Sequence, residues 1–89
     1  MFYTYVTLSN KDNTTYIGYT SDLRQRMIDH NAGKTRSIKH KMPLELIYYE
    51  AYTNSTLARK REIELKTNSF KKKELFERLG LTKARSSNG

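Results

Sequence analysis

Aromatic and β-branched residues dominate three short stretches of the chain, and such stretches are typical of β-strands. They are FYTYVTLS at residues 2–9, TYIGY at residues 15–19 and LELIYYEAY at residues 44–52. Residues 11–14, KDNT, are polar and suit the loop of a hairpin, which makes the first two strands antiparallel neighbours. Strict alternation along the third strand predicts that three of its apolar side chains share one face: Leu44, Leu46 and Tyr48.

Capping residues and helical spacing mark three other segments as helices. The first is predicted at about residues 22–31 with Ser21 as its N-cap, the second at about residues 55–66 and the third at about residues 69–79. Residues 33–42, GKTRSIKHKM, have no apolar period and are predicted to form a basic loop. One face of the second helix is expected to carry Leu57, Ala58, Arg61, Glu62 and Leu65.

The order of these elements, two strands, a helix, a basic loop, a strand and two helices, predicts an α+β fold. In such a fold a three-stranded antiparallel sheet is flanked by helices. With 89 residues the chain suits a single domain with one modest core. We expect this domain to span residues 1–80, followed by a polar, flexible C-terminal tail at residues 81–89.

The composition limits the cellular location and the kinds of binding partner that we expect. Apolar residues make up 36% of the chain, the mean hydropathy is −0.85, and no apolar run approaches the ~20 residues that span a bilayer. The chain contains no Cys and does not begin like a signal peptide, so we expect a cytoplasmic protein without membrane contact. A net charge of +8 favours a polyanionic partner, of which nucleic acid is the first candidate.

Asp22, Arg26 and His30 recur every four residues and therefore share one face of the first predicted helix. Spacing alone favours an ordinary interpretation, a solvated stripe with an Asp22–Arg26 ion pair. Gly18 favours a functional interpretation instead, because a glycine inside a strand often marks a place that another group approaches closely. Across the hairpin, Tyr5 is expected close to Tyr16.

Glu62 follows Ala58 on the apolar side of the second helix, where a carboxylate needs a partner or a cation. The ordinary partner is one of the many Lys or Arg side chains. A single carboxylate completed by waters and a substrate phosphate also suits Mg²⁺. It does not suit zinc, because the chain has no Cys, and His30 and His40 lack a partner at ligand spacing.

The loop before the third strand is a candidate for nucleic-acid binding. Its cationic side chains can follow a phosphate backbone, although a charge run is also an ordinary solvated surface. We favour phosphate contact for this loop, whose candidate residues are Lys34, Arg36, Lys39, His40 and Lys41.

Several ordered motifs together resemble one family. Tyr3-Thr-Tyr5-Val is followed by Tyr16-Ile-Gly18, then by Asp22-Leu-x-x-Arg26-x-x-x-His30-x-x-Gly33. Pro43-Leu-x-Leu-Ile-Tyr-Tyr-Glu50 and Ala58-x-x-x-Glu62-x-x-Leu-Lys66 continue the match over roughly residues 2–75. The set resembles the GIY-YIG nuclease domain, and its short single-domain bacterial members most of all.

The resemblance implies a metal-dependent DNA endonuclease that hydrolyses phosphodiester bonds with Mg²⁺ or Mn²⁺, structure-selective cutting in DNA repair or recombination being one setting. It assigns catalytic roles to Tyr5, Tyr16, Arg26 and His30, metal binding to Glu62 and a site-shaping role to Gly18. It leaves open which tyrosine or histidine is the general base.

The chain departs from the family pattern at two places, and a second function stays open. The first motif contains Tyr-Thr-Tyr where the family name has Gly-Ile-Tyr, and Tyr19 stands where some DNA-repair members carry a lysine. The alternative is a non-catalytic nucleic-acid-binding module or adaptor that keeps the fold. Cleavage assays with divalent metal distinguish the two.

Overall fold

The computed structural model describes residues 1–81 and confirms the α+β architecture. Strands β1 (Phe2–Ser9), β2 (Thr15–Thr20) and β3 (Leu44–Tyr52) form one antiparallel sheet in the order β2-β1-β3. The predicted hairpin joins β1 to β2, and β2 is therefore an edge strand. Apart from Leu81, the tail expected at residues 81–89 lies outside the described residues.

Four helical segments accompany the sheet: α1 (Leu23–Asn31), the 3₁₀ helix η1 (Arg36–Lys41), α2 (Ser55–Thr67) and α3 (Ser69–Arg78). Asp22, and not Ser21, caps α1, because its side chain accepts a hydrogen bond from the Gln25 amide at 3.0 Å. The prediction of a loop over residues 33–42 missed η1. Ile38, the only apolar residue of that helix, is buried and holds the basic segment against the fold.

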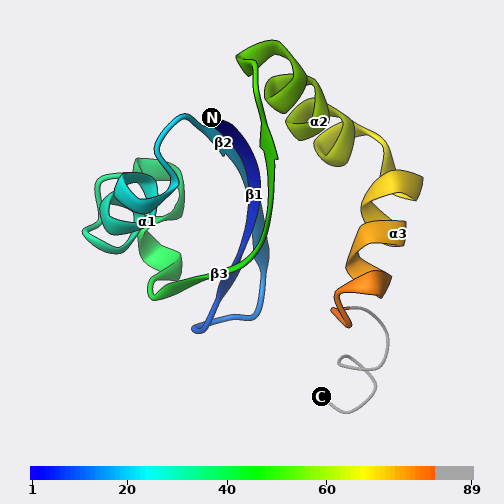
Figure 1. Ribbon diagram of the computed structural model, residues 1–89. Helices are drawn as coiled ribbons and strands as arrows, with labels where there is room; N and C mark the ends of the chain where they lie inside the picture. Colours follow the sequence, from blue (N-terminus) through cyan, green and yellow to red (C-terminus); the bar gives the residue numbers. More distant parts are fainter. Residues whose placement is uncertain (82–89) are drawn as a thin grey trace.

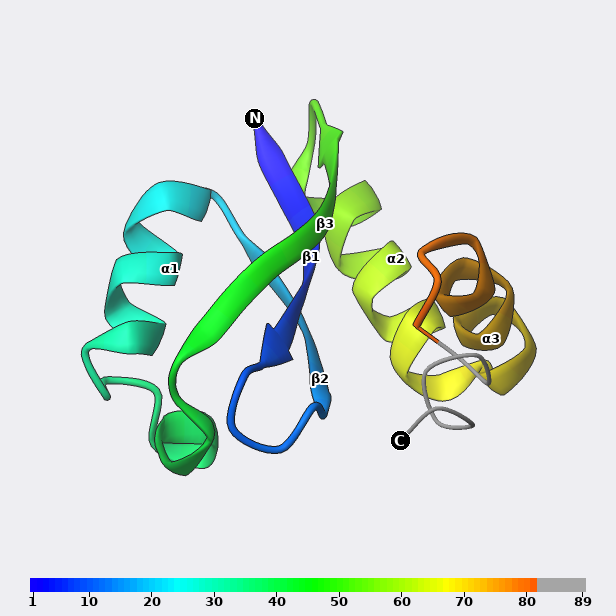
Figure 2. The ribbon, with the colours of Figure 1, turned by 90° about the horizontal axis from the view of Figure 1, so that it is seen from below.

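The helices cover both faces of the sheet. Figure 1 shows α1 and η1 on one face and α2 and α3 on the other, and the rotated view in Figure 2 gives the same arrangement. A core of Val6, Ile17, Leu65 and Leu75 fills the space between the sheet and the α2–α3 pair. None of the described helices has the length and apolar character that crossing a membrane requires.

A β-bulge in β3 changes which side chains share a face. Val6 pairs with Tyr48 and Thr7 pairs with Leu46, so Ile47 is an extra residue between the two pairs. Opposite residues in a ladder lie on the same face. Tyr48 therefore packs with Val6 on the α2 side and Leu46 lies on the α1 side, and the prediction that both share one face with Leu44 was wrong.

A polar clamp, made by Tyr48, Glu50, Tyr52, Arg61 and Glu64, fixes α2 on the sheet. Arg61 Nε donates to both carboxylate oxygens of Glu50 at 3.1 and 3.2 Å. Both tyrosine hydroxyls also donate to Glu50, and Arg61 pairs with Glu64 at 2.7 Å. Ala58 and Leu65 are the buried residues of α2. Leu57 was predicted on the same inward face but is exposed.

Candidate active site

Tyr5 and His30 form a buried pair between the central strand and α1. The Tyr5 hydroxyl lies 2.7 Å from Nε2 of His30, and the two residues are 1% and 0% exposed. Gly18 is the residue directly opposite Tyr5 in the ladder, and a Cβ atom there would overlap the Tyr5 ring and hydroxyl. Gly18 thus makes room for the Tyr5 side chain, which is the group that approaches this strand closely.

Thr35 extends this pair into a chain of three polar groups. Nδ1 of His30 lies 2.7 Å from the Thr35 hydroxyl, so each ring nitrogen has one hydroxyl partner. A neutral imidazole donates through one nitrogen and accepts through the other, and a hydroxyl can do either. The chain Tyr5–His30–Thr35 can therefore hold a proton in two alternative arrangements.

Two pKa shifts keep the side chains of Tyr5 and His30 uncharged near neutral pH. Burial lowers the pKa of His30 from its ordinary 6.5, the Arg26 charge lowers it further, and Asp29 partly offsets both effects. Burial raises the pKa of Tyr5 well above its ordinary value, with a further rise from Tyr16, a decrease from Arg26 and a rise from Glu62. Tyr5 therefore holds its proton strongly, while neutral His30 accepts a hydrogen bond at one ring nitrogen from one of its two hydroxyl partners.

Tyr16 packs against the same histidine and is only partly buried. Its ring meets the His30 ring edge-on with 5.5 Å between the centroids, and the Tyr5 ring lies 6.4 Å away. The ammonium group of Lys66 lies 5.9 Å from the centre of the Tyr16 ring. Of the two tyrosines of the cluster, Tyr16 is the one that solvent reaches.

Arg26 has no carboxylate partner among the described residues, although it lies near the cluster formed by Tyr5, Tyr16 and His30. Within residues 1–81 its side chain makes no hydrogen bond or ion pair, since Asp22, the expected partner, caps α1 instead. Arg26 stands one helical turn before His30 on the same face of α1, and its charge lowers the pKa of both Tyr5 and His30. A cation in that position is available to an anion from solution.

Glu62 reaches the cluster from the opposite face of the sheet. Its side chain is 16% exposed and accepts a hydrogen bond from Lys66 at 3.0 Å. Its charge raises the pKa of Tyr5, whereas the charge of Arg26 lowers it, and the two residues come from helices that cover different faces of the sheet (Figure 1). Tyr5, Tyr16 and His30 therefore form one cluster beside β2, and Glu62 is linked to it through Lys66.

The donor set limits what metal the cluster can hold. Among the described residues no group of three or more His, Cys, Asp or Glu side chains could hold a metal ion. A cation at Glu62 therefore has to take its other ligands from water and from a substrate phosphate. That donor set fits Mg²⁺ or Mn²⁺, which prefer oxygen ligands and, in the case of Mg²⁺, keep several waters.

The predicted nucleic-acid-binding residues lie on and just before η1. Arg36, Lys39 and His40 are exposed, and Lys34 makes only a long 3.8 Å ion pair with Asp29. Lys41 has a task within the fold, because it donates to Thr14 at 2.8 Å and to Asp12 at 3.3 Å in the hairpin. Phosphate contact by this segment stays a prediction.

Sequence reasoning missed Thr35 and Lys66 as parts of the cluster. Lys66 stands four residues after Glu62, which is the spacing of a helical ion pair, so the pair was predictable. Thr35 lies in an irregular segment, and nothing in its local pattern indicates that its hydroxyl meets His30.

Comparison with known protein families matches residues 1–74 to the GIY-YIG catalytic domain. The chain belongs to the GIY-YIG family. A "UPF0213 protein" of Bacillus pumilus is 39% identical over 75 residues, which cover 83% of this chain and 76% of that relative. "UPF0213 protein YazA" of Bacillus subtilis is 42% identical over 67 residues, covering 74% and 68%.

A third relative, "UPF0213 protein SERP0126" of Staphylococcus epidermidis, is 46% identical over 57 residues, covering 63% of this chain and 70% of that protein. No solved structure matches the chain. Membership of the GIY-YIG catalytic family indicates nuclease-like chemistry on a nucleic acid, and such domains typically use a divalent metal.

Proposed function

We propose that this protein is a metal-dependent endonuclease that hydrolyses phosphodiester bonds in DNA at the edge of β2. The observation that carries the proposal is the position of Arg26. An arginine without a carboxylate partner among the described residues lies one helical turn from the histidine of a buried tyrosine–histidine pair, and Glu62 lies on the other side, paired with Lys66 beside the Tyr16 ring. One cation for phosphate, one carboxylate for metal and a chain of proton-holding groups are what phosphodiester hydrolysis needs.

Arg26 binds the scissile phosphate in this proposal. A guanidinium forms short, charge-assisted hydrogen bonds with phosphoryl oxygens, and these bonds strengthen as negative charge builds up in the transition state. The positive charge is fixed on α1 before substrate arrives and has no competing carboxylate within residues 1–81.

Tyr16, Tyr5 and His30 handle the attacking water and its proton. Tyr16 is accessible and orients the water through its hydroxyl. Neutral His30 accepts through one ring nitrogen and donates through the other, and Tyr5 and Thr35 fix the ring on either side at 2.7 Å. The raised pKa of Tyr5 argues against a phenolate at that position, so Tyr5 gives its proton to His30 only as it takes one from the attacking water.

Glu62 holds the divalent metal. A bound Mg²⁺ or Mn²⁺ supplies Lewis-acid polarisation of the phosphate and stabilises the leaving oxygen. Glu62 must release Lys66 for this, and the ammonium group then stays close by, over the Tyr16 ring. Lys66 is therefore in a position to contact the same phosphate.

A cleavage assay with matched arginine variants tests the proposal. Purified protein is incubated with single-stranded, nicked, branched and duplex DNA in Mg²⁺, in Mn²⁺ and in chelator. Wild type and Arg24→Ala, which removes an exposed arginine from the same helix, should cut at least one substrate only when metal is present. Arg26→Ala should bind that substrate and cut it at least ~100-fold more slowly.

The outcomes separate the proposed enzyme from the alternative. DNA binding by wild type without cleavage under any of these conditions would identify a non-catalytic binding module. Cleavage by Arg26→Ala at the rate of Arg24→Ala would reject the site while leaving the activity in place.

A further inference from the structure

A hollow of about 490 Å³ lies between β2 and the first half of α2, away from the Tyr5–His30 pair. Its lining residues are Tyr19, Ser55, Thr56, Arg59, Lys60 and Ile63. An aromatic ring, an aliphatic side chain, two hydroxyls and two cations thus surround one open space.

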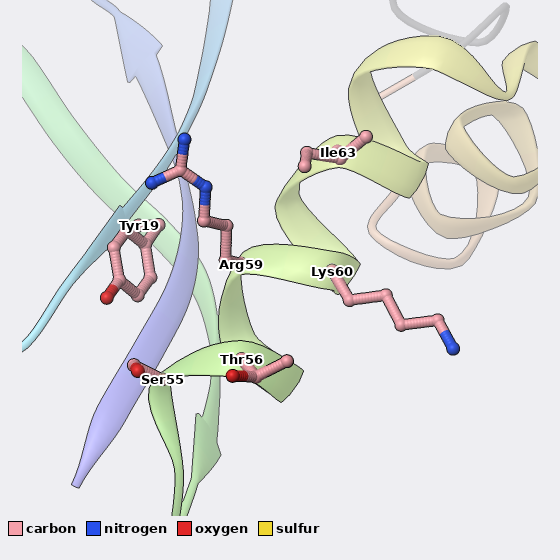
Figure 3. Close-up of a pocket in the computed structure, with 6 residues that line it drawn as sticks. All are labelled: Tyr19, Ser55, Thr56, Arg59, Lys60 and Ile63. Carbon is pink, nitrogen blue, oxygen red and sulfur yellow. The ribbon is translucent and has the colours of Figure 1, made fainter.

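The side chains differ in how they face the hollow. Figure 3 shows Arg59 reaching from α2 toward β2 and Tyr19, with Ser55 and Thr56 below them, while Lys60 points away. Within the described residues no hydrogen bond or cation–π contact joins Tyr19 to Arg59. The two side chains therefore face the same space without filling it.

One face of α2 carries residues of both the hollow and the candidate active site. Arg59, Glu62 and Lys66 follow each other at helical spacings of three and four residues, so they form one stripe on α2. Along β2, Tyr19 is three residues from Tyr16, or about 10 Å, with Tyr19 on the α2 face of the edge strand and Tyr16 on the α1 face. Bases of a stacked strand rise about 3.4 Å per nucleotide, so this interval corresponds to about three nucleotides around the edge of β2.

We propose that this hollow is a subsite for a nucleotide flanking the scissile phosphate, with its base stacked on Tyr19 and a phosphate bound by Arg59. The inference rests on the proposed function, since it places the same nucleic acid strand across the cluster. Aromatic rings and cationic side chains in one groove are the features by which proteins hold unpaired nucleotides.

The chemistry of the lining favours a nucleotide over other occupants. Tyr19 offers a flat π surface, Ile63 adds an apolar contact and Arg59 a forked donor for phosphate oxygens. The +8 net charge of the chain attracts a polyanion. Entry into the hollow requires a base that is not stacked inside a duplex, so the substrate has an unpaired nucleotide beside the cut.

A fluorescence titration tests the stacking directly. The chain has no Trp, so Tyr19→Trp introduces a single indole at the proposed stacking position. Tyr49→Trp, at a 53% exposed position on the other edge strand, is the matched control. Titration uses a short single-stranded DNA and an abasic strand of equal length, both without metal so that nothing is cut.

The expected result is saturable quenching of Tyr19→Trp by the DNA, with little quenching by the abasic strand and little in Tyr49→Trp. Equal quenching in the two variants, or none in Tyr19→Trp at DNA concentrations where the protein is bound, would overturn the subsite. DNA that does not bind at all would overturn the subsite and the proposed function together.

Binding measurements on three alanine variants give the second test. Tyr19→Ala and Arg59→Ala should each weaken binding of single-stranded DNA by ~10-fold, and Arg59→Ala should lower the salt dependence by about one phosphate contact. Lys60→Ala removes the same charge from a side chain that points away, and should cost less than about threefold. Equal losses in Arg59→Ala and Lys60→Ala would contradict the subsite.

These readouts separate the two proposals. Quenching and variant effects in a protein that never cuts DNA would leave the subsite standing and refute the nuclease. Cleavage that is unchanged in Tyr19→Ala and Arg59→Ala, with binding also unchanged, would refute the subsite and leave the nuclease intact.

Discussion

The ring of Tyr5 occupies the space that a side chain at Gly18 would fill. The two residues are directly opposite in the β1–β2 ladder, and the missing Cβ lets the Tyr5 ring lie across the neighbouring strand. The Tyr5 hydroxyl meets His30 at 2.7 Å in this position. Gly18 therefore acts on the candidate active site through Tyr5, without touching the substrate.

Gly18→Ala should disturb the site through that overlap. The new methyl group would displace the Tyr5 ring and its bond to His30, which should lower the free energy of unfolding by ~1–3 kcal/mol and slow cleavage. Urea unfolding and single-turnover cleavage measure the two effects. In a Tyr5→Ala background the same substitution should cost much less, and additive costs would speak against the overlap.

Thr35→Val should slow cleavage while leaving DNA binding unchanged. The substitution keeps the shape but removes the hydroxyl that holds Nδ1 of His30, so the ring loses its fixed proton arrangement. We expect a decrease of ~10-fold in the single-turnover rate. Thr35→Ser keeps the hydroxyl and should stay close to wild type, and a loss as large in the serine variant would point to packing instead.

His30 should make folding stability depend on pH below neutrality. Its folded pKa is lowered by burial and then by Arg26, so the unfolded chain binds a proton more readily than the folded one. This contribution to stability is complete above the unfolded pKa of 6.5 and is lost as the pH falls through the lowered folded value. Urea unfolding between pH 7.5 and pH 4.5 should show the decrease, and His30→Gln should lack it.

Arg26 should account for part of that lowered pKa. Arg26→Gln removes the positive charge beside the imidazole, which raises the pKa of His30 toward its ordinary value. A ring-proton NMR titration of His30 reports the change. An unchanged His30 titration in this variant would show that the guanidinium does not lie beside the ring.

Arg61→Met should destabilise the fold by leaving Glu50 without its cation. Burial raises the pKa of Glu50, but hydrogen bonds from Tyr48, Tyr52 and Arg61 outweigh it, so the carboxylate is charged at neutral pH. Removing one partner of such a partly buried pair should cost ~1–3 kcal/mol in urea unfolding. Lys60→Met, at an exposed position on the same helix, should cost little.

Local sequence patterns predicted the strands and helices of the fold. They failed where contacts between distant segments determine the face that a side chain occupies or the conformation of a segment. The β-bulge at Ile47 moves Tyr48 to the other face of the sheet, and no feature of LELIYYEAY marks the extra residue. Ile38 orders a basic segment that has no apolar period, because a single buried side chain leaves no periodic signal.

The candidate site was predictable only through the resemblance of its ordered motifs. Spacing alone favoured an Asp22–Arg26 ion pair, and the structure instead uses Asp22 as a helix cap. Gly18 was correctly singled out for close approach, but the group that approaches is Tyr5 from the next strand. The hollow beside Tyr19 combines β2 with α2, and its two sides are 36 or more positions apart in the sequence.

Single-turnover cleavage by Glu62→Gln tests the central claim most directly, with Glu45→Gln on the exposed side of β3 as its control. Both proteins are mixed in excess with labelled DNA that wild type cuts, in Mg²⁺ and in chelator. If Glu62 holds the metal, Glu62→Gln should bind the DNA as wild type does and cut it at least ~100-fold more slowly, while Glu45→Gln should cut normally. Metal-dependent cleavage by Glu62→Gln at the wild-type rate, or cleavage by wild type in chelator, would contradict this claim.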